Sequence, residues 1–223
     1  MTVEPGPLRA PGTLVLPGDF SSAAFLLVAA ACVPGSRVTL EGLGLNPTRI
    51  RLLEILKRMG ALVRWTTVET SWEPRGTVEL EARPLRGLTL EAAEVPSLID
   101  ELPILMVAAA CAQGTTRLQG LGELRVKETD RVRSMVDALG RFGARIRLGA
   151  AEGVEIEGGR LRGAVVDSAG DHRTAMSLAV AGLAAEGATT VRGAECVAKS
   201  FPEFFDCLRR LAGSSTVKTV DKA

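Results

Sequence analysis

The chain of 223 residues can form one large domain or two small ones, and its 46% hydrophobic content excludes an intrinsically disordered protein. Lysine and arginine (27) nearly balance aspartate and glutamate (26), and this net charge of +1 argues against a nucleic-acid-binding or membrane-surface protein. No apolar stretch reaches the length of a membrane span and no secretion signal opens the chain, so we expect a soluble, cytoplasmic protein.

Three apolar segments of similar sequence recur along the chain, at 25–35 (FLLVAAACVPG), 104–114 (ILMVAAACAQG) and 177–187 (SLAVAGLAAEG). Each predicts a buried helix that ends in a glycine C-cap, and each is followed by a short strand-like run. Internal repetition of this kind indicates that one structural unit occurs three times.

A second helix is expected in each copy, because the same apolar offsets recur after each strand-like run. These positions lie on one helical face. They are Leu52, Leu53, Leu56 and Met59; Met135, Val136, Leu139 and Phe142; and Phe204, Phe205, Leu208 and Leu211.

Two copies continue into a predicted β-hairpin, at 61–84 and at 144–159, whereas the third copy stops near Gly213. The missing hairpin is either dispensable or supplied by another segment. We favour the second alternative, because an open sheet edge promotes aggregation.

The predicted fold class is therefore α/β, with one domain built from three β-α-β-α-β-β repeats, of which the third is incomplete. We place the repeats at about 13–84, 85–160 and 161–213. A tail at 1–12 would precede this domain, and a polar tail at 214–223 would follow it.

The four cysteines are Cys32, Cys111, Cys196 and Cys207, and none forms a C-x-x-C pair. His172 is the only histidine, so we do not expect a zinc site. Cys32 and Cys111 end identical VAAAC strings, in which a small buried side chain is the ordinary role. We predict structural, reduced thiols.

The starts of the first helices carry polar residues, and helix starts attract anions. Asp19 and Asp171 align as helix caps, and Ser21, Asp100 and Arg173 share another aligned position.

Charged loops precede the second helices of copies two and three, at 125–131 (RVKETDR) and 198–203 (AKSFPE), whereas 45–48 (LNPT) is uncharged. Each loop alone fits a solvated helix start, and Ser200 with Glu203 fits a capping box. Their convergence on one face of the repeat predicts an anion site. Its six ionisable residues would be Asp100, Lys127, Glu128, Arg131, Arg173 and Lys199.

The chain resembles the 5-enolpyruvylshikimate-3-phosphate synthase family in five strings that occur in family order. The combination of RVKETDR with DHR-x-AM is the most specific part of the resemblance. The strings are PGDFSSAAF (17–25), LNPTR (45–49), RVKETDR (125–131), GDHRTAM (170–176) and AKSFPEFF (198–205).

The resemblance implies the C-terminal portion of an enzyme with two similar domains, each one half of an inside-out α/β barrel. In this family a short N-terminal segment of the full chain completes the domain, which agrees with the missing hairpin. The resemblance therefore implies the N-terminal half of the same enzyme as a partner.

The implied reaction transfers the enolpyruvyl group of phosphoenolpyruvate to the 5-hydroxyl of shikimate 3-phosphate and releases phosphate, with no metal or organic cofactor. It belongs to the shikimate pathway, which leads to the aromatic amino acids, and it is the target of glyphosate. By resemblance, Asp100 binds the shikimate hydroxyl and accepts its proton, and Glu128 protonates the methylene carbon of phosphoenolpyruvate.

The implied phosphoenolpyruvate ligands are Arg131, Arg173 and Lys199. Forked guanidinium groups suit a small molecule with two anionic groups. Lys127 would contact shikimate 3-phosphate, and His172 lies beside these residues with a less defined role.

Two departures from the family pattern limit these expectations. Glu123 occupies a position where some members have asparagine, so no ligand role is assigned to it. The substrate contacts of the other half of the family have no counterpart in this chain. We therefore expect the isolated chain to fold but to have negligible turnover, and the matching N-terminal half to restore activity.

Two alternatives remain open at the level of sequence. One is a sister enolpyruvyl transferase that acts on UDP-N-acetylglucosamine, which shares the three-unit architecture. The other is a non-catalytic relic domain that binds anions. The motifs RVKETDR and DHRTAM favour the shikimate branch, and the intact set of ionisable residues argues against a relic.

Overall fold

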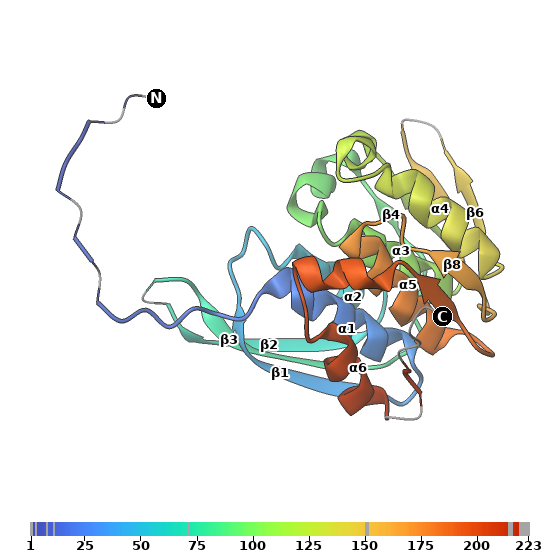
Figure 1. Cartoon of the computed structure of the whole chain (residues 1–223), viewed down its shortest axis with the longest axis horizontal. Helices are drawn as coiled ribbons and strands as arrows, with labels where there is room; N and C mark the ends of the chain where they lie inside the picture. The colour runs from blue at the N-terminus through green and yellow to red at the C-terminus, as the bar shows by residue number, and fades with distance from the viewer. Residues whose placement is uncertain are drawn as a thin grey trace.

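The computed structural model describes residues 2, 4–7, 9, 10, 12–70, 72–149, 152–213 and 216–218. The predicted tails at 1–12 and 214–223 thus fall partly outside the described residues. The chain leading into the first helix runs away from the body of the molecule (Figure 1), and Val15 and Leu16 on it are 65% and 81% exposed.

Three apolar helices form the centre of the molecule: α1 (Phe20–Cys32), α3 (Leu102–Cys111) and α5 (His172–Ala184). Each contacts the other two (Figure 1). Their sequences are apolar on nearly every side, which is typical of a helix surrounded by protein. This confirms the prediction of three buried helices.

The predicted glycine C-caps of the three central helices are wrong, because another residue caps each helix. Each helix ends at an extended C-cap residue, and the glycine comes two positions later, where the chain turns into the next strand. The left-handed backbone is present as expected, at Gly35 (φ 77°), Gly114 (φ 84°) and Gly187 (φ 94°). These glycines therefore shape the turn and do not cap the helix.

The first copy forms a three-stranded antiparallel sheet in the order β1 (Arg37–Gly44), β3 (Arg75–Glu81), β2 (Leu62–Glu69). The β2–β3 pair is the predicted hairpin. The strand expected before α1 is reduced to a single parallel bridge between Gly18 and Leu43. Pro17, directly before the bridge, has no N–H to donate to a ladder.

The second copy has the complete set of strands, in the order β4 (Thr89–Leu90), β5 (Thr115–Leu118), β7 (Val154–Glu157), β6 (Arg145–Leu148). The β4–β5 pair is parallel, and the other pairs are antiparallel. The β6–β7 hairpin confirms the second predicted hairpin.

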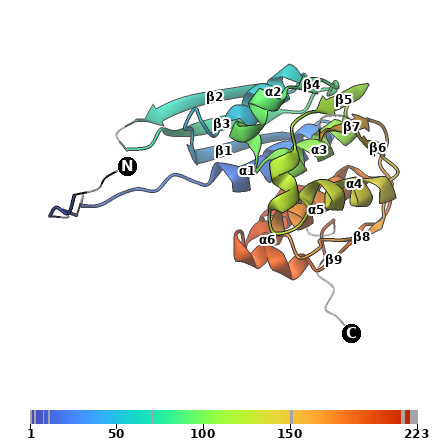
Figure 2. The same ribbon diagram turned by 90° about the horizontal axis from the view of Figure 1, so that it is seen from above.

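The third copy contains only the parallel pair β8 (Val165–Asp167) and β9 (Thr190–Arg192). Within the described residues no strand follows its second helix, in agreement with the predicted missing hairpin. Figure 2 shows the β1-β3-β2 sheet and the β8-β9 pair on opposite sides of the helical centre.

The second helices are α2 (Arg51–Arg58), α4 (Arg131–Arg141) and α6 (Phe204–Ala212). At the last repeated apolar position, Met59 and Phe142 are fully buried, whereas Leu211 is 57% exposed. The third copy has no hairpin among the described residues to cover this side of α6. Across the described part of the chain, no helix is both long and apolar enough to cross a membrane.

Short 3₁₀ helices precede α3, α4 and α6: η1 (Ala92–Leu98), η2 (Gly122–Val126) and η3 (Ala194–Lys199). The predicted charged loops begin in the last residues of η2 and η3 and extend to the start of the α-helix that follows. The predicted Ser200–Glu203 capping box is wrong, because α6 begins only after Glu203 and no side chain caps it.

Candidate functional site

The start of α5 is fixed by Asp171, which is fully buried. Its Oδ1 accepts hydrogen bonds from the backbone N–H groups of Arg173 (2.8 Å) and Thr174 (3.0 Å). Burial raises the pKa of Asp171, but hydrogen bonds from Arg131 and from these N–H groups outweigh it, so the pKa lies below its usual value. The structure confirms that Asp171 caps the helix, and the same carboxylate also binds Arg131.

Arg131, the first residue of α4, is only 2% exposed and lies among three carboxylates from different elements. Its Nε donates to Asp171 Oδ2 at 2.7 Å, and its Nη2 donates to Glu128. Its Nη1 lies 3.8 Å from Asp100 Oδ1. A buried guanidinium needs such partners, and the network therefore fixes its position between α3 and α5.

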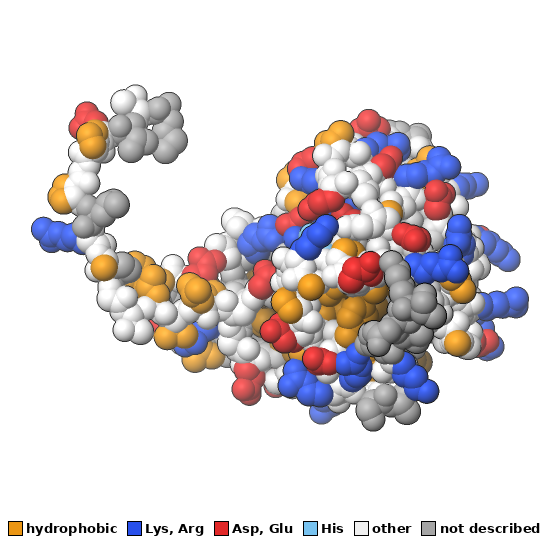
Figure 3. Space-filling model, in the orientation of Figure 1, with side chains coloured by type: hydrophobic (Ala, Val, Ile, Leu, Met, Phe, Trp, Pro, Cys, Tyr) orange, Lys and Arg blue, Asp and Glu red, His pale blue; other side chains and the backbone are white. Residues whose placement is uncertain are grey.

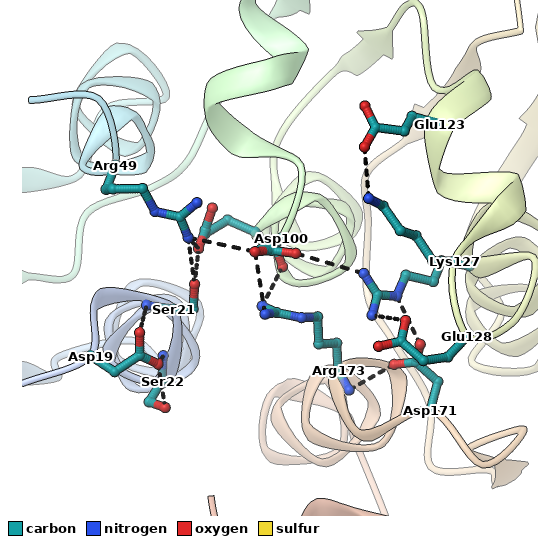
Figure 4. Close-up of polar contacts among 12 residues, drawn as sticks. Asp19, Ser21, Ser22, Arg49, Asp100, Glu123, Lys127, Glu128, Asp171 and Arg173 are labelled. Atoms are coloured by element: carbon teal, nitrogen blue, oxygen red, sulfur yellow. Dashed lines mark hydrogen bonds and ion pairs between the residues drawn. The ribbon is translucent and has the colours of Figure 1, made fainter. Parts of the chain in front are cut away.

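Asp100 lies at the end of the turn that leads into α3 and meets Arg173 in two ways. Arg173 Nη1 donates to the Asp100 carbonyl oxygen at 3.1 Å, and Arg173 Nη2 lies 3.4 Å from Asp100 Oδ2. The Asp100 side chain retains 26% exposure, so it borders both the protein interior and solvent. Figure 4 shows the Asp100 carboxylate facing Arg173.

Arg49 is a third cation beside Asp100, and the sequence analysis did not assign it to the site. Its Nη2 lies 3.5 Å from Asp100 Oδ2 and 3.6 Å from Glu101 Oε1, and it donates to Ser21 Oγ at 3.0 Å. It follows the uncharged 45–48 loop, at the end of the string LNPTR. That string was the only signal for it. The first copy thus contributes a guanidinium to the same cluster (Figure 4).

Glu101 is a second residue that the sequence analysis missed. It is only 1% exposed, and its Oε1 accepts a hydrogen bond from Ser21 Oγ at 2.5 Å. Burial raises the pKa of Glu101, and the hydrogen bond from Ser21 and the charge of Arg49 offset this only in part. Its Oε2 is buried without a hydrogen-bond partner. Its position directly after Asp100 in the sequence does not indicate that its side chain is buried.

The two predicted lysines lie at the edge of the cluster. Lys127 Nζ donates to Glu123 Oε1 at 2.6 Å, and its side chain points toward Glu123 in Figure 4. Lys199 is exposed, donates to the Gly170 carbonyl oxygen at 3.4 Å, and lines an open hollow of about 560 Å³.

His172 is the first residue of α5 and is partly buried beside the cluster. Burial lowers the pKa of His172, and the nearby charge of Asp171 opposes this shift only in part. Its imidazole therefore favours the neutral form at neutral pH.

Four of the predicted site residues, Asp100, Glu128, Arg131 and Arg173, thus form one connected network, and the remaining three surround it. Positive and negative side chains are interspersed on the face shown in Figure 3, in line with the small net charge. Within the described ranges, no group of three or more His, Cys, Asp or Glu side chains is arranged to hold a metal ion.

The fold first defines the class of protein. The structure of NikO from Streptomyces tendae, described as an enolpyruvyl transferase, matches with a TM-score of 0.67 at 20% identity, over 89% of this chain and 44% of that one. This likeness shows that the chain has the fold of enolpyruvyl transferases.

The sequence then identifies the family. The chain belongs to the EPSP synthase (3-phosphoshikimate 1-carboxyvinyltransferase) family, whose family model matches residues 1–208. The 3-phosphoshikimate 1-carboxyvinyltransferase of Synechococcus sp. (strain JA-3-3Ab) is 48% identical over 92% of this chain. The EPSP synthase structure from Acinetobacter baumannii has a TM-score of 0.83 and 42% identity, and the match covers 88% of this chain.

The chain spans about half the length of the curated relatives it matches, since the match covers 46% of both the Synechococcus protein and the Acinetobacter structure. The family resemblance noted in the sequence is confirmed.

Proposed function

We propose that this chain acts in the transfer of the enolpyruvyl group from phosphoenolpyruvate to the 5-hydroxyl of shikimate 3-phosphate, with release of phosphate. The observation that carries the proposal is the cluster in which Asp100 lies within 4 Å of Arg49, Arg131 and Arg173. Family membership supplies the reaction, and the cluster supplies a site with the charges that this reaction needs.

Phosphoenolpyruvate carries a phosphate and a carboxylate on a three-carbon frame. We assign its binding to Arg131, Arg173 and Lys199. Two guanidinium groups can each offer paired N–H donors to one anionic group, and a lysine adds a point charge. Arg131 is held by Asp171, so its fork is oriented before any substrate binds.

The reaction needs two side chains: an acid that protonates one substrate and a base that takes a proton from the other. We assign Glu128 to protonate the methylene carbon, which makes C2 electrophilic, and Asp100 to accept the proton of the attacking hydroxyl. Lys127 is assigned to shikimate 3-phosphate, and His172 lies beside the phosphoenolpyruvate residues. Elimination of phosphate from the tetrahedral intermediate would reuse the same groups in reverse.

Binding of phosphoenolpyruvate requires an exchange of ion pairs. Arg131 Nη2 donates to Glu128, and Arg173 Nη2 faces Asp100 Oδ2. When these donors turn to the substrate, Glu128 and Asp100 are released to face the reacting atoms. The same contacts would therefore keep the acid and the base from acting before phosphoenolpyruvate is bound.

We further propose that a second domain supplies the other substrate contacts, and that a segment outside this chain covers the side of α6 where Leu211 is 57% exposed. Closure of two domains would expel water and strengthen the charge interactions at the site. A cytoplasmic location fits the four free thiols.

The test combines this chain with the N-terminal half of a 3-phosphoshikimate 1-carboxyvinyltransferase and measures phosphate release from phosphoenolpyruvate and shikimate 3-phosphate. We expect negligible turnover from the chain alone and turnover from the mixture. The variants D100N and E128Q should each lower kcat by about 10²-fold or more. The matched control R133A should leave kcat unchanged, because Arg133 is 66% exposed and pairs with Asp137 outside the cluster.

The outcomes separate the alternatives. Turnover with UDP-N-acetylglucosamine in place of shikimate 3-phosphate would assign the chain to the sister reaction. No calorimetric binding of phosphoenolpyruvate by the mixture, with shikimate 3-phosphate present, would indicate a relic. Full turnover by the chain alone would overturn the need for a second domain and leave the assigned reaction standing.

A further inference from the structure

Two cysteines occupy equivalent positions at the ends of neighbouring central helices. Cys32 is the last residue of α1 and Cys111 is the last residue of α3. The sequence predicts both as buried structural thiols, but the structure leaves both partly exposed. Both still pack against the hydrophobic core, so the pair stands between the core and the surface.

Both cysteines line one pocket of about 280 Å³, together with Gly35, Arg83 and Pro84. This pocket lies at the C-terminal ends of α1 and α3, whereas the Asp100 cluster lies at their N-terminal ends. The 13 residues of α1 separate the two places by about 18 Å. The thiol pocket is therefore distinct from the candidate functional site.

The two cysteines lie close enough to affect each other's pKa. The hydrogen-bonding contact with Cys111, followed by burial, raises the pKa of Cys32 well above its usual value. The same contact lowers the pKa of Cys111, against the opposing effect of burial. The two thiols therefore titrate as a pair, and either sulfur can act as the first nucleophile once it is deprotonated.

We propose that Cys32 and Cys111 form a dithiol redox site that a small-molecule disulfide oxidises to an intramolecular disulfide. The thiolate of one of the two cysteines attacks one sulfur of the oxidant, forms a mixed disulfide and releases the first small thiol. The sulfur of the other cysteine, after loss of its proton, then attacks the protein sulfur of the mixed disulfide and releases the second small thiol. Two protein thiols are oxidised, and one small disulfide is reduced to two thiols.

The other two cysteines provide internal controls. Cys196 is 8% exposed and packs in the hydrophobic core. Cys207 is partly exposed and lies on α6, where its Sγ accepts a hydrogen bond from Arg210 Nη2 at 3.0 Å. Neither cysteine lines the pocket shared by Cys32 and Cys111.

A disulfide at this site would join the first and second copies of the repeat and close a loop of roughly 80 residues. Closing a loop of that length restricts the unfolded chain, so the oxidised protein should unfold at a temperature higher by on the order of 10 °C. The site would thereby couple thermal stability to the thiol–disulfide balance of its surroundings.

The test incubates the folded chain with oxidised glutathione, counts free thiols and maps peptides without reduction. We expect two of the four thiols to disappear together, with a crosslinked peptide that joins Cys32 to Cys111. In C32A and in C111A, the remaining cysteine of the pair should accumulate a mixed disulfide with glutathione, because no second thiol is there to resolve it. The control C207A should form the crosslink at the rate of the original chain.

Three results would overturn the proposal. They are a lasting glutathione adduct on Cys32 or Cys111 in the chain that retains both, crosslinks that join only separate chains, and reaction of Cys207 alone. A circular dichroism melt of each variant verifies that the reduced protein is folded before oxidation.

Discussion

Arg131 Nε lies 2.7 Å from Asp171 Oδ2, and the two side chains are 2% and 0% exposed. The pair joins the start of α4 to the start of α5, between elements of two different copies of the repeat. Because Asp171 also caps α5, one carboxylate fixes the direction of that helix and the position of the guanidinium. The stability of the domain and the geometry of the cluster therefore depend on the same contact.

Replacement of Arg131 by methionine should lower the free energy of unfolding by about 3–5 kcal/mol, because Asp171 would remain buried without its charge partner. Urea denaturation followed by circular dichroism measures the change. R133M is the matched control on the same helix and should cost less than about 1 kcal/mol, since its ion pair with Asp137 is exposed. Equal losses in the two variants would contradict the importance of the buried pair.

Acidification should weaken the protein through Asp171. Its pKa in the folded state lies below the usual value of 3.8, so its stabilising contribution is fully present above about pH 4. That contribution is lost as the pH falls from there through the folded pKa. In D171N this part of the pH dependence should be absent, and denaturation series between pH 2 and pH 5 provide the measurement.

Glu101 should have the opposite effect on stability. Its pKa in the folded state is raised above the usual 4.5, so the folded protein holds this proton more tightly than the unfolded chain. Its contribution to the free energy of unfolding therefore decreases as the pH rises from about 4.5 through the folded pKa. E101Q should remove this decrease, because a glutamine at this position does not titrate. If the free energy of unfolding of E101Q depended on pH as in the original chain, the decrease could not be attributed to Glu101.

Arg49 should matter for catalysis in the completed enzyme, although it is 43% exposed. R49A removes one of three cations beside Asp100 and should lower kcat/KM by about 10-fold to 100-fold, with R49K recovering part of the loss. R145A is an exposed arginine control on β6, paired with Glu157. Steady-state phosphate release gives the comparison. Wild-type rates in R49A would exclude Arg49 from the site.

The repeated apolar position should show unequal energetic importance among the three copies. Met59 and Phe142 are fully buried, so alanine at either position should cost about 2–5 kcal/mol. L211A should cost less than about 1 kcal/mol in the isolated chain, because Leu211 is 57% exposed. Addition of the N-terminal half should raise the cost of L211A if that half covers α6, and denaturation with and without it measures the difference.

The periodic parts of the fold could be predicted from sequence because they repeat. The VAAAC strings, the apolar faces of α2 and α4 and the β2–β3 hairpin each follow a local pattern with a direct physical meaning. The extent of the strand expected before α1 could not be predicted from a local sequence pattern. Whether Gly18 pairs along a whole strand or through one bridge depends on Pro17 and on the partner segment.

The candidate site was only partly visible in the sequence. Asp100, Glu128, Arg131 and Arg173 stand in charged or conspicuous motifs at helix starts, whereas Arg49 follows an uncharged loop. Arg49 donates to Ser21 on α1, which packs against α3, and no local pattern encodes these contacts between distant segments. Burial of Glu101 and exposure of Leu211 likewise depend on which elements cover them.

Asp100 is surrounded by one guanidinium from each tandem copy: Arg49 from the first, Arg131 from the second and Arg173 from the third. No pair of copies can reproduce this arrangement, so a shortened protein with two copies would lose at least one charge partner of the carboxylate. The cluster of charges around Asp100 therefore requires all three copies of the repeat in one chain.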